Sequence, residues 1–244
     1  MSSKNVLTVQ RSAERAFFDH GWLQTSHSFS FADYHDPANI HWGALRVFND
    51  DIVQPAQGFG THPHRDMEIL TYVLDGELTH RDSMGNVRTV TSGGVQYLSA
   101  GTGITHSEYN ASSTTPCHLV QMWVVPTARG LQPRYGQVDF TAADRHGRWL
   151  VVASGRPGIE APVTIWQDAT CSVARLQQSS VSMQLETGRY AFLFLAKGEL
   201  AVESPAHENL TLHAGDALRL RDALDLQLHG DGELILWDIP AMPL

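Results

Sequence analysis

Short apolar or alternating runs, separated by Gly, Asp, Asn and Pro, recur along the chain and restrict it to a β fold. They include Trp42–Phe48, Ile69–Leu74, Leu119–Val125, Ala191–Leu195 and Leu234–Trp237. The dipeptides Asp75-Gly76, Lys197-Gly198 and Asp231-Gly232 are typical of tight turns, where glycine adopts positive φ. Many short strands with such turns between them predict an all-β barrel or sandwich.

The two halves of the chain repeat one strand and turn pattern. Leu70–Leu78 is similar to Phe192–Leu200 at an offset of 122 residues, and Gly94–Leu98 parallels Gly215–Leu220 at nearly the same offset. An offset of half the chain length predicts the duplication of one β-barrel domain. The expected domains are residues 1–135 and residues 140–244.

Two short histidine-bearing stretches, 44 residues apart, indicate a metal site. The first contains His62 and His64, and the second contains His106 and Glu108. Side chains at positions i and i+2 of a strand point to the same face, so the members of each pair project together. If the two strands approach each other, three imidazoles and one carboxylate converge on one point. That donor set suits a divalent transition metal.

The alternative interpretation is a set of surface histidines at strand ends. The chain has 13 His in 244 residues, and random placement gives about one His-x-His or His-x-Glu pair. The context favours the metal site, because Gly-bearing turns precede both pairs and a strand-turn-strand pattern separates them. Glu68 continues the alternating face beyond His64. We expect Glu68 either near the metal or in the barrel lumen, hydrogen-bonded to its neighbours.

The second half keeps the strand pattern but not these donors. At the same offset, His62 and His64 correspond to Gln184 and Glu186, and the second pair corresponds to residues 227–229. A glutamine and one carboxylate make a poor transition-metal site. We therefore expect one metal per chain.

Composition limits the function classes. The net charge is −9 with scattered Lys and Arg, so the sequence lacks the cationic footprint that direct nucleic-acid binding needs. The two cysteines, Cys117 and Cys171, are spaced neither as a metal pair nor as a redox pair. No run approaches membrane-spanning length, and the N-terminus shows no apolar signal-peptide segment. We expect a cytoplasmic protein with no membrane or nucleic-acid partner.

The residues around both histidine pairs resemble the pirin family of bicupins. The likeness begins at His27–Tyr34 and Leu45–Asp51, is closest over Gly58–Ile69, and continues through His80–Ser83 and Ser99–Glu108. It is strong from residue 27 to about residue 125, and over the second half only the β pattern is shared. The resemblance implies two cupin-type, jelly-roll β-barrels, of which the first binds the metal.

The resemblance also implies that His62, His64, His106 and Glu108 hold one Fe(II) ion. Nickel, copper, cobalt, manganese or zinc accept the same donors. Cupins in general often take a ligand at the position of Glu68, whereas pirins take theirs at that of Glu108. Several pirins act on the flavonol quercetin as 2,3-dioxygenases, which implies a small aromatic substrate and O2. Four protein ligands leave metal positions open for substrate, and we expect Glu108 to be the catalytic base.

A flavonol needs a flat apolar pocket. The aromatic residues that are candidates for its walls are Trp42, Phe48, Phe59, Tyr72, Tyr97 and Trp123. Each of them also suits an ordinary barrel core.

Two other functions are compatible with the sequence. Some pirins are described as metal-dependent transcription co-regulators, and an acidic chain in that role would bind protein rather than DNA. A cupin isomerase acting on a sugar or keto acid is the third candidate, and it would not use O2. In each case we expect a monomer.

Overall fold

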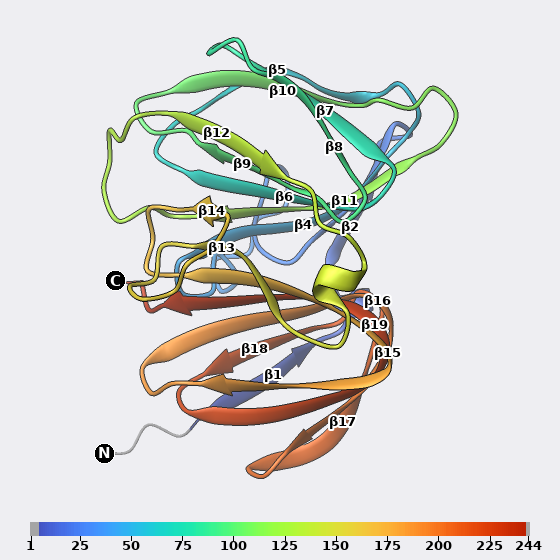
Figure 1. Cartoon of the computed structure of the whole chain (residues 1–244), viewed down its shortest axis with the longest axis vertical. Helices are drawn as coiled ribbons and strands as arrows, with labels where there is room; N and C mark the ends of the chain where they lie inside the picture. The colour runs from blue at the N-terminus through green and yellow to red at the C-terminus, as the bar shows by residue number, and fades with distance from the viewer. Residues whose placement is uncertain (1–4, 243–244) are drawn as a thin grey trace.

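The computed structural model describes residues 5–242 and is built almost entirely of strands. Figure 1 shows two β-barrel halves stacked along the longest axis, the N-terminal half in blue to green and the C-terminal half in orange to red. The prediction of an all-β bicupin is confirmed. Within the described residues the helical elements are two short turns, η1 (Ser12–Glu14) and η2 (Ala143–Arg145), and no helix could span a membrane.

Two facing sheets form the N-terminal half. The four-stranded sheet runs in the order β5 (Gly58–His64), β10 (Ile104–Asn110), β7 (Glu77–Asp82) and β8 (Val87–Thr91). The seven-stranded sheet runs in the order β12 (Arg134–Val138), β9 (Val95–Ser99), β6 (Glu68–Asp75), β11 (Cys117–Val124), β4 (Leu45–Val53), β3 (Leu23–His27) and β2 (Ala16–Asp19). All pairings in these two sheets are antiparallel.

One eight-stranded sheet forms the C-terminal half. Its order is β1 (Val6–Gln10), β18 (Ala217–Arg221), β16 (Arg189–Ser204), β19 (Leu224–Pro240), β15 (Thr170–Leu185), β13 (Leu150–Ser154) and β14 (Val163–Thr164), with β17 (His207–His213) beside β16. Strand β1 pairs with β18, so the start of the described chain lies in the C-terminal sheet rather than among residues of the first barrel (Figure 1). The division between residues 135 and 140 otherwise stays a prediction.

The seven-stranded sheet is buried on both faces, which explains the continuous apolar runs in its central strands. Along β11, Leu119 packs in a cluster inside the N-terminal barrel, while Val120 and Met122 pack toward the C-terminal half. The boundary between the halves is an aromatic core in which Phe48 contacts Phe192 at a ring-centroid distance of 4.8 Å. This continuous core fixes one face of the sheet and leaves its other face to form the barrel lumen.

A buried polar group also crosses the boundary between the halves. The hydroxyl of Tyr72 donates a hydrogen bond to the carboxylate of Glu233, and Arg145 Nη1 donates to the Tyr72 oxygen at 2.6 Å. Tyr72 comes from β6, Glu233 from β19 and Arg145 from η2. Three distant segments are therefore tied together at one buried point.

Candidate metal centre

The pairing of β5 with β10 brings the two histidine stretches together. In this antiparallel pair His62 lies opposite His106, and His64 lies opposite Ile104. The ring centroids of His62, His64 and His106 are 4.5 to 4.9 Å apart. One ligand nitrogen from each of the three lies within 4.8 Å of the others. This clustering favours the metal site over the interpretation as surface histidines at strand ends.

A bulge in the same strand pair sets the position of Glu108. His106 pairs with His62 while Glu108 pairs with Phe59, so β5 uses one residue more than β10 over this stretch. Gly58 makes the close approach possible, because a Cβ there would lie 2.1 Å from the carbonyl oxygen of Glu108 and 2.5 Å from the Cα of Tyr109. Any larger residue at position 58 would push the two strands apart.

Hydrogen bonds orient two of the imidazoles for metal binding. His62 Nδ1 lies 2.7 Å from the carbonyl oxygen of Gly60, which can only accept, so Nδ1 carries the proton and Nε2 keeps its lone pair. His106 Nε2 is buried and has no hydrogen-bond partner within the described residues. Burial next to the other imidazoles lowers the pKa of His106 to about 2 and that of His64 to about 4. For His64 and His106 this favours neutral rings with lone pairs available to a cation.

Two further side chains, His80 and Asp82, orient His106 through a chain of hydrogen bonds. His80 Nε2 lies 3.0 Å from the Asp82 carboxylate, and His80 Nδ1 lies 3.3 Å from His106 Nδ1. Because a carboxylate only accepts, His80 protonates Nε2 and offers Nδ1 as an acceptor. His106 then carries its proton on Nδ1 and directs an unprotonated Nε2 away from His80. Such outer partners commonly fix the tautomer and orientation of a metal-ligating histidine.

Glu108 lies beside His106 but outside the cluster of three imidazoles. It forms a compact group with His106 and His80 rather than with all three clustered histidines, as judged within residues 5–242. Its carboxylate accepts hydrogen bonds from Gln96 Nε2 and, at 2.8 Å, from Gln121 Nε2. Burial raises the pKa of Glu108 to about 7, and the two amide donors oppose that shift.

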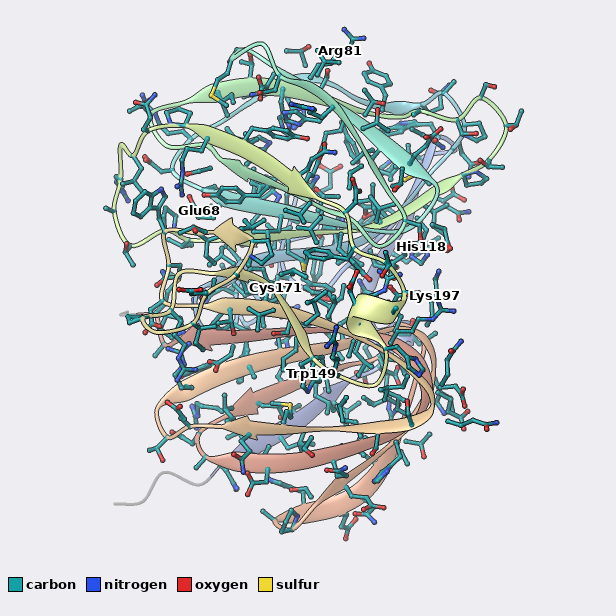
Figure 2. The ribbon with its side chains drawn as sticks, viewed as in Figure 1. Glu68, Arg81, His118, Trp149, Cys171 and Lys197 are labelled. Atoms are coloured by element: carbon teal, nitrogen blue, oxygen red, sulfur yellow. The ribbon has the colours of Figure 1, made fainter. Side chains whose placement is uncertain are left out.

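Glu68 lies outside this site, and its expected shared face with His64 is wrong. Strand β5 ends at His64, and Asp66 adopts a left-handed φ of 49° before β6 begins, so the alternation of side chains restarts. The Glu68 carboxylate instead accepts hydrogen bonds from Tyr97 (2.6 Å), Ser99 (2.6 Å) and the backbone N–H of Trp166 (3.0 Å). Figure 2 shows it close to the boundary between the two halves.

A cavity of about 190 Å³ lies beside the histidine cluster. His62, His64 and Glu108 are among its lining residues. Its other lining residues are Leu23, Thr25, His27, Phe31, Asn49, Asp51, Phe59, Gln121 and Trp123. Of the six aromatic candidates for its walls, Phe59 and Trp123 line it, whereas the other four belong to or pack against the core between the halves.

Comparison with known proteins identifies the family. The family model described as Pirin matches residues 8–124, and the one described as Quercetinase C-terminal cupin domain matches residues 151–239. A protein of Escherichia coli K12 named quercetin 2,3-dioxygenase is 40% identical over 239 residues, covering 96% of this chain and 99% of that protein. The chain belongs to the pirin family.

Other pirins support both the fold and a metal. The pirin-like protein of Caulobacter vibrioides is 40% identical over 223 residues, which cover 90% of this chain and 94% of that protein. The crystal structure of the bacterial pirin YhhW from E. coli in complex with nickel(II) matches with a TM-score of 0.86 and 38% identity. The match covers 97% of this chain and all of that one. Together with the histidine cluster, this supports a divalent metal site in this pirin.

Sequence reasoning assigned no role to several residues of the site. His80 and Asp82 lie in a stretch that resembles the family, and their i, i+2 spacing on β7 could have indicated a shared inward face. Gln96 and Gln121 gave no signal, because a single glutamine in a strand is uninformative. The pairing of β9, β6 and β11 places them in one row, and Glu108 on β10 of the other sheet reaches both of them.

Proposed function

We propose that this chain is a metal-dependent dioxygenase that opens a flavonol such as quercetin with O2. In this proposal one divalent metal, Fe(II) in the first instance, is held by His62, His64, His106 and Glu108. The observation that carries the proposal is the position of the three clustered imidazoles beside a cavity with aromatic walls. The name of the E. coli relative supports the choice of substrate class.

The residues at the cluster fit the proposed metal. Two imidazoles have their Nδ1 atoms engaged by the surrounding chain, and the buried Nε2 of His106 lacks a protein partner among the described residues. Imidazole nitrogen with one carboxylate is a donor set that Fe(II) and its neighbours in the transition series accept. When bound, the metal supplies Lewis acidity and the means of reaction with O2.

In the proposed reaction the chain's own residues bind the substrate and accept a proton. Glu108 accepts the proton of the flavonol 3-hydroxyl on a carboxylate oxygen and so acts as the general base. Gln121 orients that carboxylate, and its own amide is fixed because Trp123 Nε1 donates to Gln121 Oε1 at 3.1 Å. Phe31 and Trp123, in edge-on contact at 5.4 Å, provide an apolar wall for a flat ring.

The charge of the cavity argues against acidic substrates. Its lining residues include two acidic side chains, Asp51 and Glu108, and no Lys or Arg. A keto acid or a phosphorylated sugar would find no Lys or Arg in this lining to pair its charge and would depend on the proposed metal alone. A neutral phenolic molecule needs no such pairing.

Turnover tests the proposal directly. Purified chain reconstituted with Fe(II), and in parallel with nickel, cobalt or manganese, is mixed with quercetin while absorbance and O2 uptake are recorded. We expect quercetin loss that requires both metal and O2. The variant His106→Ala should lose this activity, whereas His213→Ala, at an exposed position on β17, should retain it.

The controls separate the candidate functions. Quercetin loss under anaerobic conditions, or none with O2 and every metal tested, would reject the dioxygenase. Metal and flavonol binding without O2 uptake would favour the regulatory alternative.

A further inference from the structure

A polar patch on the inner face of β3 and β4 has no role in holding the metal. Thr25 and His27 alternate along β3, and Asn49 and Asp51 alternate along β4. The strand register places His27 opposite Asn49 and Thr25 opposite Asp51, so the four side chains share one face. All four line the cavity, and each is at most 4% exposed.

Three atoms of this patch lack partners among the described residues. They are His27 Nδ1, Asn49 Oδ1 and Asp51 Oδ1. An unpaired polar atom in a buried site is destabilising, and most buried polar atoms in native proteins have a partner. The residues that carry these atoms line a cavity, so a hydrogen-bonding ligand there can supply the missing partners after a side-chain rotation.

The patch continues into the row of side chains that holds Glu108. Across the sheet, His27 lies opposite Asn49, Asn49 opposite Gln121, and Gln121 opposite Thr71, which lies opposite Gln96. Gln96 and Gln121 both donate hydrogen bonds to Glu108. At the other end of the row, Asn49 Oδ1 and His27 Nδ1 have no hydrogen-bond partner among the described residues. A molecule that reaches from Glu108 along this row would therefore meet unpaired groups beside aromatic walls.

The chemistry of the free atoms selects the ligand. Asn49 Oδ1 can only accept a hydrogen bond. Burial lowers the pKa of His27 to about 4 and raises that of Asp51 to about 7, which disfavours charge on either group. The cavity therefore offers hydrogen-bond acceptors, and its lining contains no Lys or Arg. Such a site suits a neutral ring whose hydroxyl groups donate hydrogen bonds.

We infer that His27, Asn49 and Asp51 form a subsite that recognises hydroxyl groups on the pendant ring of an aromatic substrate. This inference rests on the proposed function, since it assumes that the substrate reaches the metal end of the same cavity. It assigns substrate selection to β3 and β4, separate from the four proposed metal ligands.

A ligand series on the unaltered protein tests the inference without any variant. Quercetin, kaempferol and galangin differ only in carrying two, one or no hydroxyls on the pendant ring. Their dissociation constants are measured anaerobically on the metal-loaded protein by quenching of tryptophan fluorescence, because Trp123 lines the cavity. We expect quercetin to bind about tenfold or more tightly than galangin, with kaempferol between them, as one or two buried hydrogen bonds would give.

Variants then assign the preference to residues. Asn49→Leu and Asp51→Leu remove acceptors, and we expect each to reduce the preference for quercetin while galangin binds as well or better. Asp51→Asn keeps an acceptor oxygen and should preserve the preference. Asn209→Leu, at an exposed position on β17, is the matched control.

The two proposals fail in different ways. Equal binding of the three flavonols, or a preference unchanged in both leucine variants, overturns the subsite. If the graded preference is seen and lost as expected, the subsite stands even when O2 uptake shows no turnover, and then only the dioxygenase is rejected.

Discussion

Replacing His80 with phenylalanine removes the link between Asp82 and His106 while keeping a flat ring at that position. His80 stacks on Tyr135 at a centroid distance of 4.2 Å, and a phenyl ring can keep that contact. The variant deletes the acceptor for His106 Nδ1 and the donor to Asp82. Asp82 keeps the N–H groups of Met84 and Asn86 and the Asn86 side chain.

The free-energy cost of the substitution should therefore come mainly from the lost hydrogen bond of His106. Its Nδ1–H becomes an unpaired donor in a ring that is 2% exposed, and leaving a buried donor unpaired costs about 1–3 kcal/mol. Without this hydrogen bond the His106 ring can rotate or change tautomer, and its Nε2 then no longer points toward His62 and His64. We expect metal affinity to fall roughly 10- to 100-fold, the range typical for loss of such an outer partner.

Competition with a chromogenic chelator measures the nickel or cobalt affinity at fixed pH. His118→Phe is the matched control, because it breaks another imidazole–carboxylate contact in the same barrel, with Asp50 at 2.7 Å. His80→Asn places an acceptor near the former Nδ1 and should recover part of the affinity. Equal metal affinity in His80→Phe, His118→Phe and the unaltered protein would refute the role of His80.

Two further predictions concern the strands that build the site. Gly58→Ala should lower both the melting temperature and the metal affinity, because the new Cβ would lie 2.1 Å from the carbonyl oxygen of Glu108. A melting temperature by calorimetry and a metal affinity by titration that both match the unaltered protein would contradict this. Asp51→Asn should change the pH dependence of stability in metal-free protein. The pKa of Asp51 is raised by burial from 3.8 to about 7, so ionisation is disfavoured in the folded state and the free energy of unfolding falls as pH rises through that window. The variant lacks this term and should gain up to about 4 kcal/mol relative to the unaltered protein between pH 4 and 7.5, at about 1.4 kcal/mol per pKa unit. Urea unfolding that shows the same pH dependence of the free energy of unfolding for the two proteins would contradict it. The charged groups that act on Asp51 are Asp50, Arg15 and Glu108.

The strand pattern and the duplication could be predicted because both are local in sequence. Leu70–Leu78 runs from β6 into β7, and its counterpart Phe192–Leu200 lies within the longer strand β16. Strand β6 pairs with β9 as β16 pairs with β18. The pairing of β1 with β18 could not be predicted, since nothing in Val6–Gln10 indicates a partner more than 200 residues away.

The clustering of His62, His64 and His106 followed from strand alternation and one assumption about neighbouring strands. The error at Glu68 has the same origin, because alternation was extended through a turn at Asp66 that the sequence does not reveal. Residues that orient the site, such as His80 and Gln121, come from other strands, and only the three-dimensional pairing of those strands brings them together.

Locating the metal by anomalous X-ray scattering from crystals of the nickel- or iron-loaded chain tests the ligand assignment most directly. We predict one ion per chain, bonded to Nε2 of His62 and His106, to a ring nitrogen of His64 and to a carboxylate oxygen of Glu108. An ion bound at His80, an ion in the C-terminal barrel, or a Glu108 carboxylate that stays on Gln96 and Gln121 away from the metal would contradict it.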